Sequence, residues 1–167
     1  MLNIWPISFP TPVQEGFAAT ASSITKSADA QLNPWTIITS PFFNSGSFDT
    51  TSGNYTVPAT GRYGLKATIN YNLAVVIQVT LGSGIMPYFS VRRSAPTATD
   101  LITGYLPVLD VNISLVNIRA ILQASTVTLS GEVELNAGDV VGLYYFADTF
   151  NLSLTFGPVY WSINRIT

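Results

Sequence analysis

The sequence predicts an all-β fold whose antiparallel strands pack as a sandwich or close as a barrel. Val, Ile, Thr, Tyr and Phe, which favour strands, dominate the 167 residues. Turn-forming residues recur at short intervals, and no window shows a sustained apolar period of 3.6 residues with helix caps. Many short strands with frequent turns are typical of sandwiches and barrels.

The chain begins with a proline-rich segment. Pro6, Pro10 and Pro12 predict an extended arm or linker over residues 1–13, ahead of a single domain at 14–167. The first residues have neither the basic region nor the continuous apolar region of a secretory signal. No apolar stretch approaches the roughly 20 residues that a membrane-spanning helix needs, so we expect no membrane insertion.

Strands are expected wherever β-favouring residues lie between turn residues. The breakers include Asn33-Pro34, Ser52-Gly53, Gly61, Gly82-Ser-Gly84 and Ala95-Pro96. The expected strands, some of which would merge, lie near 14–24, 35–39, 46–49, 54–57, 62–73, 75–81, 86–93, 101–108, 111–122, 125–135, 139–147 and 159–166.

The strands show two patterns of polarity. Residues 125–135 alternate between polar and apolar side chains, which predicts one face on the core and one in water. Residues 140–147 and 74–79 are apolar on both faces, so something must cover their outer face. We favour a neighbouring subunit, and the alternative is a loop of the same chain.

The composition indicates that part of the apolar surface is covered, and it excludes several classes of protein. Charged residues make up 10% of the chain and apolar residues 47%, whereas soluble domains carry roughly 25% charge. The chain has no Cys and no His, which excludes disulfide scaffolds, a Cys nucleophile and a Ser-His-Asp triad. The net charge of −2 argues against nucleic acid as a partner.

One motif resembles a known family. The stretch Phe48-Asp-Thr-Thr-Ser-Gly53-Asn-Tyr55-Thr-Val-Pro58-Ala-Thr-Gly61-Arg-Tyr63 is similar to the globular head of complement component 1q and its relatives, with Ser52 in place of a Thr. The pair of segments joined by Gly138-Asp139 is similar to a late pair of strands in that family. The ending Tyr160-Trp-Ser-Ile-Asn-Arg-Ile166 departs from the family's Phe-Ser-Gly-Phe and looks more like that of bacterial and viral members.

The motif residues have structural roles on physical grounds. Gly53 follows three Thr and Ser residues where a turn needs positive φ, and Pro58 ends a strand. We expect the motif to build turns and a strand and to bind no substrate. Its residues are Phe48, Asp49, Gly53, Tyr55, Pro58, Gly61, Tyr63, Gly138 and Asp139.

The resemblance implies a ten-stranded jelly roll of the tumour-necrosis-factor type, assembled as a homotrimer. It further implies a non-enzymatic head domain with a structural or adhesive role, on a bacterial spore or cell surface or on a virion fibre. Because the last two strands of that fold run near the three-fold axis, the C-terminal aromatic residues are candidates for the trimer interface, with the sandwich core as the other location. These residues are Tyr144, Tyr145, Phe146, Tyr160 and Trp161.

Candidate chemical groups are few, and we expect no cofactor. Glu132 and Glu134 share one face of a strand about 7 Å apart, a separation that suits a glycosidase pair or a cation site, but the alternation of the strand already explains them as an exposed polar face. Asp100, Asp110 and Asp148 at strand ends are candidates to share a calcium ion at a trimer apex, as in some relatives.

The remaining polar motifs have ordinary explanations. Arg92-Arg93, the one basic pair, would bind an acidic group across an interface or mark an exposed strand end. The triplets that begin at Asn54, Asn112 and Asn151 fit the glycosylation sequon but also arise by chance.

A second function remains open at this point. A carbohydrate-binding jelly-roll module would use exposed aromatic residues to stack on sugars, and Trp5, Trp35 and Tyr88 are the candidates. Loops 82–87, 94–100 and 147–153 are the expected positions for contacts with a protein or glycan ligand.

Overall fold

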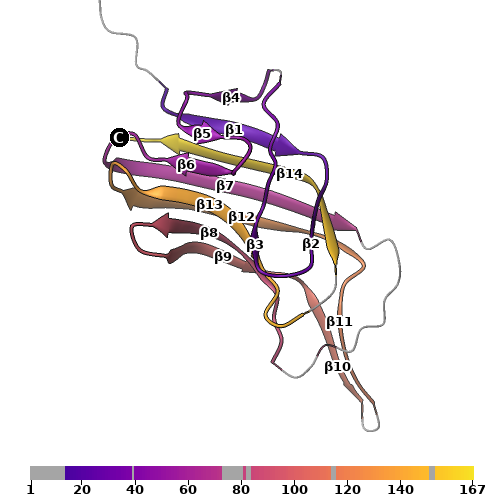
Figure 1. Cartoon of the computed structure of the whole chain (residues 1–167). Coiled ribbons are helices and arrows are strands. Elements are labelled where there is room, and N and C mark those ends of the chain that lie inside the picture. Colours follow the sequence, from indigo (N-terminus) through magenta and orange to yellow (C-terminus); the bar gives the residue numbers. More distant parts are fainter. Residues whose placement is uncertain (1–13, 39, 73–80, 82–83, 114–115, 151–152) are drawn as a thin grey trace, which may run out of the picture.

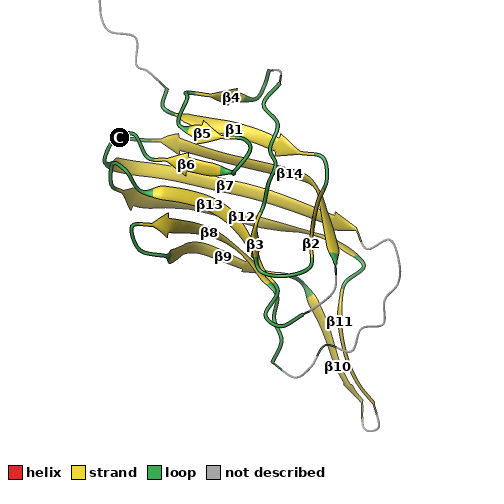
Figure 2. Cartoon of the chain, in the orientation of Figure 1, coloured by secondary structure: helices red, strands yellow, loops and turns green. Residues whose placement is uncertain are grey.

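The computed structural model describes residues 14–38, 40–72, 81, 84–113, 116–150 and 153–167, and these residues form strands and loops without a helix (Figure 2). The all-β prediction is therefore confirmed for the described residues. Accordingly, no helix in this part of the chain has the length and hydropathy required to cross a membrane. The arm expected at 1–13 lies outside the described residues.

Fourteen strands follow one another along the described chain, five of them only two or three residues long (Figure 1). They are β1 (Gly16–Ala21), β2 (Ile24–Lys26), β3 (Ala30–Gln31), β4 (Phe43–Asn44), β5 (Phe48–Asp49), β6 (Asn54–Thr56), β7 (Gly61–Asn72), β8 (Tyr88–Ala95), β9 (Thr99–Tyr105), β10 (Val108–Ile113), β11 (Val116–Ile121), β12 (Ala124–Leu135), β13 (Val140–Phe146) and β14 (Leu154–Arg165).

The strands form two six-stranded sheets and one separate hairpin, and every pairing between them is antiparallel. The first sheet has the order β12-β7-β14-β1-β4, with β2 paired to β14. The second has the order β5-β6-β13-β8-β9, with β3 paired to β13. The hairpin of β10 and β11 extends away from both sheets (Figure 1).

The core lies between the inner faces of the two sheets. In β7 the odd-numbered residues from Tyr63 to Tyr71 are buried, and the even-numbered residues point outward, as the two-residue period of a strand requires. An aromatic cluster fills one region: the Phe17 and Phe48 rings stack at 3.8 Å, and Trp161 packs edge-on against both. Such pairs add stability beyond the area that they bury.

Several expected strands differ from the observed ones. The segment 14–24 contains β1 and the start of β2, and the described residues of the segment 35–39 contribute a single bridge, between Thr36 and Thr20. Residues 101–122 form parts of β9, β10 and β11, because β10 and β11 pair with each other as antiparallel strands instead of forming one continuous strand. The strand expected at 75–81 falls almost entirely outside the described residues, as does the two-sided apolar segment 74–79.

Candidate functional site

The C-terminal aromatic residues do not share one surface, because β13 and β14 belong to different sheets. Tyr145 and Trp161 are buried in the core, so the expectation that they lie at a trimer interface is wrong: the pleat turns both side chains inward. Tyr144 and Phe146 lie partly exposed on the outer face of the β13 sheet. Tyr160 is 44% exposed on the outer face of the β14 sheet.

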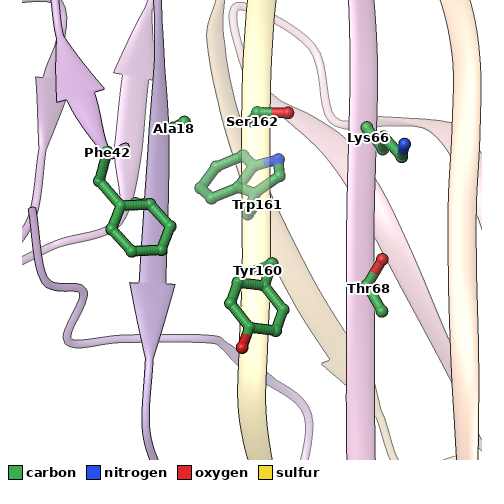
Figure 3. A pocket seen from close by; sticks show the side chains of 8 residues that line it. Ala18, Phe42, Lys66, Thr68, Tyr160, Trp161 and Ser162 are labelled. Atoms are coloured by element: carbon green, nitrogen blue, oxygen red, sulfur yellow. The ribbon is translucent and has the colours of Figure 1, made fainter. Parts of the chain in front are cut away.

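The outer face of the β14 sheet, here called the β14 face, carries a shallow hollow of about 140 Å³ (Figure 3). The Phe42 and Tyr160 rings lie nearly parallel there, with centroids 6.4 Å apart. Small or uncharged residues surround them, and Lys66 supplies the one charged side chain of the lining. The hollow is lined by Ala18, Ala19, Phe42, Lys66, Thr68, Tyr160, Trp161 and Ser162.

The outer face of the β13 sheet, here called the aromatic face, carries a run of touching rings across β13, β8 and β9. Phe146 stacks on Tyr88 with centroids 4.8 Å apart, and Tyr144 continues the run on the same strand at 6.2 Å. Tyr105 on β9 lies 5.7 Å from Tyr88 and is 57% exposed. Register explains the contacts, because Tyr88 pairs with Phe146 on one side and with Tyr105 on the other.

Polar groups hold one end of the aromatic face in place. The Arg92 guanidinium lies over the Phe146 ring at 5.2 Å and donates to Oδ1 of Asp100 at 3.3 Å. The hydroxyl of Ser90, which is fully buried, donates to the same oxygen at 3.0 Å. Burial raises the pKa of Tyr88, the charge of Asp100 raises it further, and the charge of Arg92 lowers it.

The two glutamates of β12 lie on an exposed strand face. Glu132 forms a salt bridge with Arg62, and both side chains are more than half exposed. The register explains this contact, because Arg62 pairs directly with Glu134 and reaches the neighbouring acid on the diagonal. A carboxylate that is more than half exposed and paired with an arginine is typical of a solvated strand face, so the geometry favours the polar-face interpretation.

Each of the three aspartates proposed to share a calcium ion has a different partner within the chain. Asp100 binds Arg92, Asp110 lies 3.1 Å from Nε of Arg119, and Asp148 accepts a bond from the backbone N–H of Met86. Within the described ranges, no group of three or more His, Cys, Asp or Glu residues could hold a metal ion. A single chain therefore does not bring these aspartates together.

Both arginines of the basic pair find acidic partners within the same chain. Arg93 donates to Asp139 at 3.5 Å, as Arg92 does to Asp100. Asp139 is buried, and its carboxylate also accepts the backbone N–H of Asn136, which closes the turn around Gly138. Asp139 therefore bonds the backbone of its own turn, in agreement with the turn-building role expected of the motif residues.

The first family-like motif builds a turn, as expected. Asp49 accepts the Ser52 hydroxyl and the Thr51 backbone N–H, both at 2.8 Å, and these two bonds lower its pKa. Gly53 has φ +80°, and an added Cβ would lie 2.9 Å from the carbonyl oxygen of Leu32. The turn therefore requires glycine for its conformation and for a close approach.

The rest of the motif lies against the core. Phe48, Tyr55 and Tyr63 are buried, and the Tyr63 hydroxyl donates to the carbonyl of Ala59 at 2.6 Å. Pro58 follows β6 and Gly61 opens β7, as expected for a strand end and a turn.

The aromatic residues proposed for sugar stacking lie in different parts of the chain and the fold. Trp35 is buried in the core, where its indole N–H donates to the carbonyl of Leu32 at 2.7 Å, so its expected exposure is wrong. Tyr88 lies on the aromatic face, and Trp5 falls outside the described residues. Among the sequons, Asn54 accepts a bond from Gln31, Asn112 lies on β10, and Asn151 is outside the described residues.

Sequence reasoning missed Tyr105 and Phe42, which complete the two surfaces. Tyr105 meets Tyr88 across the hairpin of β8 and β9, and Phe42 meets Tyr160 of a strand distant in the sequence, so neither contact could be identified before the fold was known. Comparison of the chain with protein-family models and with curated proteins finds no match.

Proposed function

We propose that the chain is a non-enzymatic head domain that assembles as a homotrimer and has a structural or adhesive role on a bacterial or viral surface. We propose a jelly-roll fold of the tumour-necrosis-factor and complement-1q type. The strand orders β12-β7-β14-β1 and β6-β13-β8-β9 support this fold. In both sheets, strands from the first half of the chain lie beside strands from the second half, as Greek-key connections require. The Asp49–Gly53 turn and the buried Tyr63 support the resemblance.

The observation that carries the proposed assembly is the composition of the β14 face. The central strands β1, β14 and β7 turn outward Ala18, Thr20, Tyr160, Ser162 and Thr68, and Lys66 is the one charged side chain among the residues that line the hollow. Burying such residues in a subunit interface costs little desolvation, and Tyr160 with Phe42 offers a large apolar area at its centre. A second copy placed here would hide apolar surface that a chain with 10% charged residues otherwise exposes.

A non-catalytic role agrees with the chemistry available. The strongest enzymatic alternative needs Glu132 and Glu134 to act as an acid and a base. Both are exposed on β12, and Glu132 is engaged by Arg62. We therefore infer that the chain assembles with copies of itself and recognises a partner, and that it does not catalyse a reaction.

A charge placed on the β14 face tests the proposed interface. In Tyr160→Arg, three guanidinium groups would be forced together near the axis, so we expect the trimer to dissociate into folded monomers of 18.0 kDa in sedimentation velocity. Leu109→Arg is the matched control, because Leu109 is 47% exposed on the separate hairpin, and it should leave the mass unchanged. A Tyr160→Arg protein with wild-type mass would refute this interface.

A further inference from the structure

We propose that the aromatic face binds a neutral oligosaccharide, with the sugar seated on Tyr105 and Tyr88 and its hydroxyls bonded to Arg92 and Asp100. This face lies on the sheet opposite the β14 face, so the inference adds a ligand to the proposed head domain and does not depend on its assembly.

The rings supply a platform that is already ordered. Tyr88 is fixed between Phe146 and Tyr105, so a ligand that stacks here need not restrict freely rotating side chains. Tyrosine offers rigid amphipathic contact area, with a negative ring face that attracts the C–H groups of a sugar ring. Tyr105, at the end of the run and more than half exposed, has the most accessible ring surface.

The ion pair beside the rings can bind adjacent hydroxyls. Both protein hydrogen bonds to Asp100 end on Oδ1, so among the described residues Oδ2 has no partner and can accept a hydroxyl proton. The Arg92 guanidinium, held over Phe146, has five N–H donors, of which only one donates to a described residue. A fixed acceptor next to a fixed donor matches two neighbouring hydroxyls, each of which can donate and accept.

The charge balance selects a neutral ligand. Arg92 and Asp100 neutralise each other, and the Asp29 carboxylate lies near enough to raise the pKa of Tyr88 as well. The face is thus neutral to slightly acidic, which disfavours phosphate, sulfate and nucleic acid. A purely apolar partner is also disfavoured, because it would bury the Arg92–Asp100 ion pair without bonding its remaining N–H groups and carboxylate oxygen.

The test uses the whole chain and two sets of soluble oligosaccharides. The neutral set contains oligomers of glucose, mannose, galactose and N-acetylglucosamine, and the charged set contains sialylated and sulfated oligomers. Isothermal titration calorimetry should show saturable binding of at least one neutral series. Tyr105→Ala and Asp100→Asn should each weaken that binding about tenfold or more, because each removes one kind of contact. Ile166→Ala, an exposed apolar residue beyond β14, is the control and should bind as the wild type does.

Three results would overturn the inference: no neutral series binds, only charged oligomers bind, or the two variants bind as the wild type does. Sedimentation of the same samples separates this proposal from the assembly. A trimer that binds no neutral sugar leaves the assembly intact, and a monomer that binds one leaves the sugar site intact. If Tyr105→Ala dissociates a wild-type trimer, the aromatic face is a subunit contact and the sugar site is wrong.

Discussion

Gly53 shows how a single residue holds the first turn against the core. Its positive φ suits glycine, and its missing Cβ leaves room for the Leu32 carbonyl, which in turn accepts the Trp35 indole N–H. A side chain at this position would disturb both the turn and the position of Trp35. The motif therefore links a local backbone requirement to the packing of the aromatic cluster.

Gly53→Ala should lower the free energy of unfolding by about 2–4 kcal/mol, from backbone strain plus the crowding of Leu32 and Trp35. Gly138→Ala is the matched control, since Gly138 has φ +88° but nothing within 4 Å of an added Cβ, and it should cost only about 1–2 kcal/mol. Urea denaturation of both variants gives the comparison. Equal losses would show that crowding at Gly53 contributes nothing.

At this scale the sequence predicted exposure only where alternation was regular. Glu132 and Glu134 lie outward and Leu135 inward, as the pattern of β12 indicated. Trp35 was not predictable in this way, because the next residue, Thr36, forms an isolated bridge to Thr20, and a single bridge provides no alternating pattern to assign a face. Composition alone therefore could not decide whether Trp35 stacks on a ligand or fills the core.

At the scale of elements, the strands bury tyrosine hydroxyls deeply. Tyr71 on β7 and Tyr145 on β13 have no hydrogen-bond partner for their hydroxyls among the described residues. Burial raises the pKa of both phenols, that of Tyr71 to about 12. A buried phenol ionises less readily in the folded chain than in the unfolded chain, so the free energy of unfolding decreases at alkaline pH.

The protein should lose stability above about pH 10, where tyrosines of the unfolded chain begin to ionise. Since the folded pKa of Tyr71 is raised, its contribution is full below the unfolded pKa and declines as the pH rises toward about 12. Denaturant midpoints measured from neutral to alkaline pH should fall, and Tyr71→Phe should reduce the fall while keeping neutral stability. An alkaline fall identical in Tyr71→Phe would contradict a role for this phenol.

The elements also show where a single sequence reaches its limit. Residues 111–122 were expected to form one strand, but they divide between β10 and β11, which pair with each other as a hairpin. The sequence of a strand likewise does not show which of the two sheets that strand joins. That choice depends on pairing between distant segments, and it is what separated Tyr144 and Phe146 from Tyr160.

At the scale of the whole molecule, the low content of charged residues is reflected in the two outer faces of the sandwich. One outer face of the sandwich has a single charged residue, Lys66, in the hollow around Phe42 and Tyr160, and the other carries aromatic rings and an ion pair. Two such different surfaces suit two tasks, self-association on the β14 face and recognition on the aromatic face. The central proposal is that the first of these surfaces joins three copies.

Sedimentation equilibrium of the wild-type chain at micromolar concentration tests this proposal most directly. The account predicts a mass three times the 18.0 kDa of one chain, independent of concentration well above the dissociation constant. A single species of 18.0 kDa across that range would contradict it.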